Sequence, residues 1–178
     1  HEGELMRDPH LTQGPDGTWH LLWTWGWRRD QMRGKLQIGH ATSRDLVQWS
    51  AQDSIEVWPG RPEVRNAWAP EMVWDAKQKQ WIVFFASTVK ADGPYDHRHY
   101  FMTTKDFKTF TEPKLFYDPG FNSIDASVFH DGKRWVMVFK DEREQPVMKT
   151  LRLAFAASPA GPWSAPTGPI SGDWVEGP

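Results

Sequence analysis

The feature that most constrains this chain is a pattern of strand, tight turn and strand that occurs three times. In the clearest copy, Asp125 stands at the start of a first strand, Asp131-Gly132 provides the turn, and Trp135 opens an apolar second strand. Each copy joins a carboxylate to a tryptophan that follows 10 or 11 residues later. The three pairs are Asp8 with Trp19, Glu71 with Trp81, and Asp125 with Trp135.

The carboxylates recur at intervals close to fifty residues, and a fourth copy begins at Glu176. Asp8, Glu71, Asp125 and Glu176 stand 63, 54 and 51 residues apart in turn. Each repeat contains three or four short strands and no helical period, which is typical of the blades of a β-propeller. A sandwich or a barrel would also contain many short strands. Neither predicts a carboxylate, a tryptophan and an aromatic-ended turn that recur in register.

We expect a single all-β domain over residues 1–178, an incomplete β-propeller with three blades and the first strand of a fourth. The predicted blades cover about 5–60, 66–118 and 122–171, and the fourth begins at about 173–178. The predicted strands are 6–11, 19–25, 36–43 and 55–58, then 72–74, 81–87 and 99–104, then 125–130, 135–140 and 151–157. In the matching turns 43–49 and 104–110, Asp45 and Asp106 can accept backbone N–H bonds.

This topology predicts where the carboxylates meet. In a propeller the first strand of each blade lines the central channel. If these strands run the same way, their starts meet at one mouth, and the four carboxylates converge there. The second strand of each blade returns to the same mouth, which brings Trp25 and Lys140 to it. The loops that follow would surround the mouth, at 26–35, 89–98 and 142–149.

Carboxyl groups gathered at one mouth suit the hydrolysis of a glycosidic bond. That reaction needs one protonated carboxyl group to donate to the leaving oxygen and one ionised carboxylate to activate water. A third acid nearby can keep the pKa of the donor high by repulsion between like charges. The structural alternative is that Asp8, which precedes a proline, only caps a turn. For Glu71 we expect a hydrogen bond to backbone at the channel and no catalytic role.

Four short motifs resemble those of glycoside hydrolase family 43, in the same order and over essentially the whole chain. They are Arg7-Asp8-Pro9-His10, Asn66-Ala67-Trp68-Ala69-Pro70-Glu71, Ile124-Asp125-Ala126 and Val175-Glu176-Gly177-Pro178. The resemblance implies a five-bladed β-propeller and an inverting glycosidase acting on arabinosides, xylosides or galactosides. It also implies that Asp8 is the general base, that Asp125 tunes pKa and orients, and that Glu176 is the general acid.

Other consequences of the resemblance concern cofactors and location. It implies no required cofactor, and it is compatible with a structural calcium ion at the centre of the ring, for which no residue here can be named. It suggests an extracellular or periplasmic protein. A five-bladed ring needs roughly two more blades than this chain supplies. Because open sheet edges are unfavourable in a soluble protein, we expect a piece of a longer protein or another copy that completes or covers the propeller.

Four further residues are candidates for binding a sugar, and each has a structural alternative. Trp25 and Trp68 could stack on a sugar face or pack in the core. His10 could bind substrate or be a buried, hydrogen-bonded histidine. Lys140 could contact sugar hydroxyl groups or pair with Asp125. The candidate substrate-binding set is therefore His10, Trp25, Trp68 and Lys140.

Composition excludes several other classes of function. The net charge of −2 argues against nucleic acid or an anionic membrane as a partner, and the absence of cysteine excludes disulfides and thiolate chemistry. No apolar run reaches the length of a membrane span. The seven histidines show no zinc spacing. The 12 tryptophans suit either sugar binding or an aromatic β core.

The leading hypothesis is an inverting, exo-acting glycosidase, or a fragment of one, that cleaves arabinofuranosyl, xylosyl or galactofuranosyl linkages in polysaccharides. The main alternative is a carbohydrate-binding propeller without catalysis, which the incomplete ring favours. A retaining propeller glycosidase would need an Asn-Asp-Pro-like nucleophile motif, which Arg7-Asp8-Pro9 fits poorly. The period is longer than that of WD repeats, which argues against a protein-interaction propeller.

Overall fold

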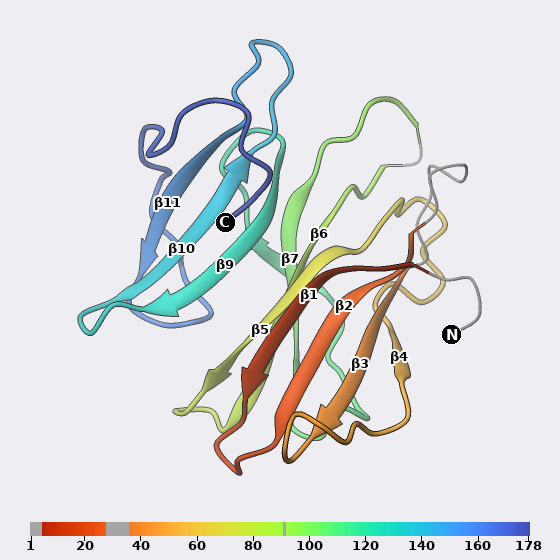
Figure 1. Ribbon diagram of the computed structural model, residues 1–178. Helices are drawn as coiled ribbons and strands as arrows, with labels where there is room; N and C mark the ends of the chain where they lie inside the picture. Colours follow the sequence, from red (N-terminus) through yellow and green to blue (C-terminus); the bar gives the residue numbers. More distant parts are fainter. Residues whose placement is uncertain (1–4, 28–35, 91) are drawn as a thin grey trace.

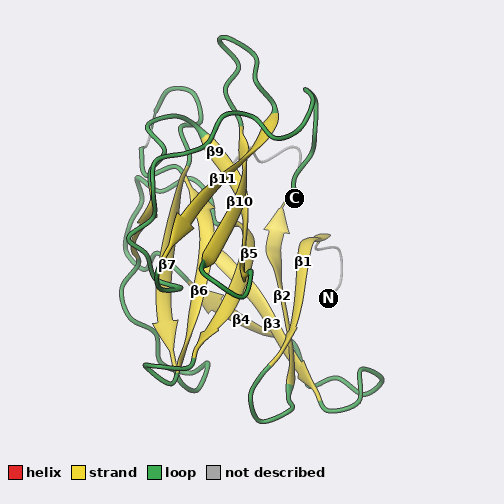
Figure 2. Cartoon of the chain, turned by 90° about the vertical axis from the view of Figure 1, so that its left-hand side faces the viewer, coloured by secondary structure: helices red, strands yellow, loops and turns green. Residues whose placement is uncertain are grey.

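The structure is a computed structural model that describes residues 5–27, 36–90 and 92–178. In these ranges it contains strands, turns and loops and no helix (Figure 2). No helix that could cross a membrane is therefore present in the described part of the chain. Most of the predicted mouth loop 26–35 lies outside the described residues.

The strands form three antiparallel sheets, each built from consecutive strands (Figure 1). The first sheet contains β1 (Leu5–Gln13), β2 (Trp19–Trp27), β3 (Gln37–Ser43) and β4 (Asp53–Glu56). The second contains β5 (Trp68–Asp75), β6 (Gln80–Ser87), β7 (Arg98–Thr104) and β8 (Lys114–Tyr117). The third contains β9 (Ser123–His130), β10 (Trp135–Asp141) and β11 (Thr150–Ala156).

The first strands of the three sheets lie side by side at the centre of the molecule. β5 contacts β1 on one side and β9 on the other, and the remaining strands fan outward in sequence order (Figure 1). This is the arrangement of propeller blades around a channel. The predicted all-β fold and the blade-by-blade strand order are confirmed.

Several predicted strands differ from the structure. β4 lies at Asp53–Glu56 rather than at 55–58, and β8, Lys114–Tyr117, was not among the predicted strands. β5 begins at Trp68 rather than at residue 72, because the segment before the predicted start continues to pair with β6. Residues 173–178 form no strand, and Val175 N–H donates to the carbonyl oxygen of Lys149 at 3.1 Å. A single extended segment is not stable as a strand without a neighbour to pair with, so the predicted first strand of a fourth blade is not formed.

The matching turns are built as the sequence predicts. Asp45 Oδ1 accepts the N–H groups of Val47 and Gln48 at 2.9 and 2.8 Å. Asp106 Oδ1 accepts those of the two corresponding residues of the second blade, Lys108 and Thr109, at 2.9 Å each. These hydrogen bonds lower the pKa of both carboxyl groups. The two turns therefore have a structural role.

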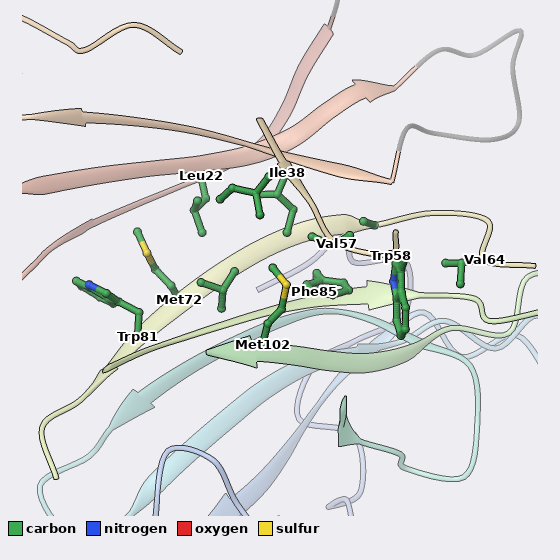
Figure 3. Close-up of a cluster of buried hydrophobic side chains, with 12 residues drawn as sticks. Leu22, Ile38, Val57, Trp58, Val64, Met72, Trp81, Phe85 and Met102 are labelled. Carbon is green, nitrogen blue, oxygen red and sulfur yellow. The ribbon is translucent and has the colours of Figure 1, made fainter. Parts of the chain in front are cut away.

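Apolar side chains fill the space between neighbouring sheets. Between the first and second sheets, Leu22 and Ile38 face Met72, Phe85 and Met102, and all five are at most 3% exposed (Figure 3). A second cluster, between the second and third sheets, contains Phe84, Phe116, Met137 and Phe139. Burial of these side chains supplies most of the free energy that holds the blades together.

A close contact within the first sheet generates a prediction about stability. The ring of Trp23, 2% exposed, lies on Gly39, and a Cβ atom at Gly39 would come within 1.9 Å of Trp23 Cε2. Gly39→Ala should therefore lower the free energy of unfolding by about 3 kcal/mol through overpacking. Urea unfolding measures this. The control, Gly168→Ala, adds a Cβ with no atom within 4 Å and should change stability little. Equal effects of the two substitutions would contradict this packing.

Candidate active site

A β-bulge interrupts each of the three central strands near its start. The pairing register shifts between Arg7 and His10 in β1, between Trp68 and Glu71 in β5, and opposite Lys140 and Val138 of β10 in β9. One residue of each bulge has a positive φ angle: 51° at Asp8, 45° at Ala69 and 53° at Asp125. Such a bulge bends the strand and changes the direction of a side chain.

The positions of the bulges show which residues of the three blades are structurally equivalent. Ala69, and not Glu71, occupies the position of Asp8 and Asp125. Glu71 lies two residues further along, at the position shared by His10 in β1 and Ser127 in β9. Ala69 precedes Trp81 by 12 residues (81−69), whereas Asp8 and Asp125 precede their tryptophans by 11 and 10, so spacing alone selected Glu71 as the equivalent residue. The second blade therefore contributes no carboxylate at the bulge.

The structure nevertheless brings all four predicted carboxylates together. Asp8, Glu71, Asp125 and Glu176 line one hollow of about 310 Å³. His10 lines it as well, and the remaining wall consists of small or rigid residues: Pro9, Ala69, Pro70, Ala126, Gly177 and Pro178. A hollow of this size is at the lower end of the range for small-molecule sites.

Asp8 is exposed, and its orientation depends on a buried hydroxyl group. The Thr24 hydroxyl donates to Asp8 Oδ2 at 2.7 Å and accepts the N–H of Ala69 at 2.9 Å. The following residue, Pro9, has no N–H to leave unpaired at the bulge. Thr24 was not among the predicted site residues. Its hydroxyl group stands between Trp23 and Trp25 in an otherwise apolar run, a pattern that indicates a polar residue with a specific partner.

Asp125 has a strongly perturbed environment. Burial and, next, the nearby Asp8 carboxylate raise the pKa of Asp125, Lys140 lowers it, and the net pKa is about 7. Gly177 packs against this side chain, since a Cβ there would come within 3.2 Å of Asp125 Oδ2. Asp125 therefore changes its protonation state near neutral pH, which suits a group that tunes its neighbours.

Glu71 resembles Asp125 electrostatically but has different partners. Burial raises the pKa of Glu71 to about 7, while the Ser127 side chain and the Val128 backbone N–H bond to its carboxylate and oppose that shift. The bond to the Val128 backbone agrees with the hydrogen bond expected for this residue at the channel. His10 Nδ1 lies 3.6 Å from Glu71 Oε2. Burial lowers the pKa of His10, so this histidine is neutral at pH 7.

Glu176 and Lys140 lie together, which differs in part from the expectation. Glu176 is exposed, and its Oε2 lies 3.7 Å from Lys140 Nζ. Lys140 is only 5% exposed and also pairs with Glu142 at 3.1 Å. Lys140 was predicted either to contact sugar or to pair with Asp125. Its ion pairs are with these two glutamates, and it also lowers the pKa of Asp125. It is not among the residues that line the hollow, and its contact with sugar stays a prediction.

The two predicted tryptophans have different surroundings. Trp25 is 8% exposed and stacks on Trp23 with ring centroids 5.7 Å apart, away from the hollow, a position that does not favour the predicted sugar contact. Trp68 is half-buried next to the hollow and packs against Tyr95 and His97, with centroids 5.2 and 4.9 Å apart. Trp68 stays a prediction as a sugar-binding residue.

No group of three or more metal-binding side chains occurs among residues 5–27, 36–90 and 92–178. His10 Nε2 is buried without a hydrogen-bond partner, and the structural calcium ion with which the family resemblance is compatible stays a prediction.

Comparison with known proteins gives a consistent result. A family model described as a probable glycosyl hydrolase domain matches residues 2–176. The chain is also 27% identical over 135 residues to an alpha-L-arabinofuranosidase of Bifidobacterium longum, a match that covers 66% of this chain and 13% of that protein.

Solved structures share the fold. An alpha-L-arabinofuranosidase from Lactobacillus brevis superposes with a TM-score of 0.69 and 18% identity, over 91% of this chain and 52% of that one. A family 117 glycoside hydrolase from Zobellia galactanivorans superposes with a TM-score of 0.70 and 14% identity, over 90% of this chain and 55% of that one. A thermostable family 43 glycoside hydrolase superposes with a TM-score of 0.68 and 14% identity, over 97% of this chain and 56% of that one. The chain spans about half the length of these five-bladed propellers.

The protonation of Glu71 generates a prediction about pH. A pKa of about 7 in the folded state, against an ordinary 4.5, means that folding favours the protonated form. The wild-type protein therefore loses stability as the pH rises from about 4.5 through 7. Glu71→Gln removes this ionisation, so its stability relative to wild type should rise by up to about 3 kcal/mol between pH 4 and pH 8.5.

Urea unfolding at pH 4, 6 and 8.5 measures this difference. The matched control is Glu144→Gln, which removes a carboxylate that is 81% exposed and should show no such pH dependence. A difference between Glu71→Gln and wild type that stays constant over this range would show that Glu71 ionises normally in the folded protein.

Proposed function

Because this chain belongs to the family of probable glycosyl hydrolase domains related to glycoside hydrolase family 43, we propose that its hollow is part of the active site of an inverting, exo-acting glycosidase. The observation that carries the proposal is the convergence of Asp8, Asp125 and Glu176 from separate parts of the chain on one hollow. Carboxyl groups held on separate elements suit the wide separation that an inverting mechanism needs for its water.

In the proposed reaction Asp8 is the general base. Its carboxylate accepts a proton from a water molecule, whose oxygen attacks the anomeric carbon from the face opposite the leaving group. Glu176, as general acid, donates its proton to the glycosidic oxygen as the bond between that oxygen and the anomeric carbon breaks. The products are a sugar of inverted configuration and the free alcohol. Asp125 has a pKa of about 7, so its gain or loss of a proton changes the electrostatic potential at the other two groups.

The Lys140 contact sets a condition on this mechanism. A general acid must carry a proton, whereas an ion pair with Lys140 requires Glu176 to be a carboxylate. Catalysis therefore needs Glu176 to leave Lys140 when a substrate enters. The side chain of Glu176 is 93% exposed, so little packing opposes this movement.

The substrate class rests on the size of the hollow and on the relatives. A hollow of about 310 Å³ suits one terminal sugar residue, which favours exo action. Two of the similar proteins are alpha-L-arabinofuranosidases. We therefore place arabinofuranosyl linkages first, followed by xylosyl and galactofuranosyl linkages.

A carbohydrate-binding propeller without catalysis is the second candidate. It is favoured by the exposed position of Glu176, whose side chain is 93% exposed. Hydrolysis and binding separate the two candidates. An enzyme releases product from a glycoside, whereas a binding module retains sugar affinity and releases none.

The proposal predicts the behaviour of two variants on p-nitrophenyl glycosides and on a natural oligosaccharide. Asp8→Asn should lower kcat/KM about 1,000-fold on both, since water loses its base. Glu176→Gln should lower it about 1,000-fold on the oligosaccharide and much less on the p-nitrophenyl glycoside, whose leaving group needs little protonation. Initial rates measure both effects, and NMR of the first product identifies its configuration.

Glu144→Gln, which changes an exposed carboxylate outside the hollow, is the control and should keep wild-type rates. Light scattering on the assayed peak shows whether a second copy of the chain takes part. Equal activity of Asp8→Asn and wild type would exclude the assigned base, and a retained product configuration would exclude the inverting mechanism.

A further inference from the structure

We propose that Thr24 is a positioning residue that fixes the Asp8 carboxylate to the backbone of the second blade. The inference builds on the proposed function, in which Asp8 is the base. Its structural part concerns a single hydroxyl group and can be tested without any activity.

The bonding of Thr24 leaves one arrangement of its proton. Thr24 is 1% exposed, and a buried hydroxyl group needs partners. Oγ1 lies 2.7 Å from Asp8 Oδ2 and 2.9 Å from the nitrogen of Ala69. The backbone N–H of Ala69 can only donate, so the single hydroxyl proton goes to Asp8. Thr24 thus bonds one residue of its own blade, Asp8, and one residue of the second blade, Ala69.

The bulges explain why these two partners are available. In the regular part of a strand, the N–H of a residue such as Ala69 would be paired within its own sheet. Here the register shift between Trp68 and Glu71 takes it out of the ladder. The facing bulge in β1 does the same for Asp8, and Thr24 pairs with the preceding residue, Arg7. The hydroxyl group therefore joins two bulges that face each other.

The other two blades provide an internal comparison. The position of Thr24, opposite the residue before the bulge, is taken by Ala86 in the second blade and by Lys140 in the third. The second blade has Ala69 in its bulge and a small apolar residue opposite. The third has Asp125 in its bulge and a lysine opposite. A polar side chain thus occurs at this position in the two blades that place a carboxylate in the bulge.

The consequence for the proposed reaction is geometric. With Oδ2 bonded to Thr24, the other oxygen of Asp8 is left to accept the proton of water. The bond also ties Asp8 to Ala69, which lines the same hollow. Displacement of a reacting group by about 1 Å can cost a factor of about 100 in rate. Thr24 therefore acts through Asp8 and touches no substrate itself.

The first test is a double-mutant cycle measured by urea unfolding, with Thr24→Val, Asp8→Ala and the double variant; alanine is used because asparagine would keep an oxygen that accepts the Thr24 hydroxyl proton. Valine has the shape of threonine and lacks the hydroxyl group. We expect the two substitutions to couple by about tenfold in the unfolding equilibrium constant. The control cycle uses Thr104→Val, which removes a buried hydroxyl bonded at 3.0 Å to the N–H of Phe107 in a distant turn. That cycle with Asp8→Ala should be additive.

The second test is kinetic. Thr24→Val should lower kcat about 100-fold with little change in KM, and Thr24→Ser, which keeps the hydroxyl group, should stay within about threefold of wild type. Additivity in the first cycle would overturn the inference. So would coupling without any change in kcat, since the bond would then be only structural. If the wild-type protein cleaves no glycoside, the proposed function fails, whereas the cycle still decides whether Thr24 holds Asp8.

Discussion

The geometry of the site depends on one backbone feature, the β-bulge at the start of each central strand. A regular strand would keep Asp8 and Asp125 in the alternating pattern of the sheet, with every N–H in the ladder. The bulges place both residues at positive φ, at 51° and 53°. Aspartate is among the residues that tolerate this conformation best, because its short side chain can bond locally. At two of the three bulges the backbone strain therefore coincides with a proposed catalytic carboxyl group, whereas the third bulge carries Ala69.

Burial has opposite effects on the two kinds of titratable group in this fold. It lowers the pKa of His40 and His97 to about 4, so these side chains make the fold more stable as the pH rises from about 4 to 6.5. It raises the pKa of Glu71 and Asp125 to about 7, so they make the fold less stable as the pH rises over a similar range. Glu71 and Asp125 therefore reduce stability at neutral pH. Buried carboxyl groups with pKa values perturbed in this way are candidates for function.

The second blade organises the hollow without supplying a proposed catalytic group. Its Ala69 N–H bonds to Thr24 and so to Asp8, and its Glu71 bonds to the strand that carries Asp125. The third blade holds the region of the proposed acid, since Lys149 accepts the N–H of Val175 and Lys140 lies beside Glu176. The site thus depends on contacts between blades, so the packing of the blades determines where its carboxyl groups lie.

The recurring strand–turn–strand pattern was enough to predict the all-β fold, the strand order and the convergence of Asp8, Asp125 and Glu176. These follow from local rules, because turn residues and apolar alternation define strands, and equal repeats define blades. The equivalence of Ala69 with the two aspartates, the burial of Trp25 and the pairing of Lys140 depend on register and on packing between sheets. A bulge shifts register by one residue without a reliable sequence signal. Only the folded chain therefore shows that Thr24 lies between Asp8 and Ala69, since these three residues come from three strands and meet through tertiary contacts.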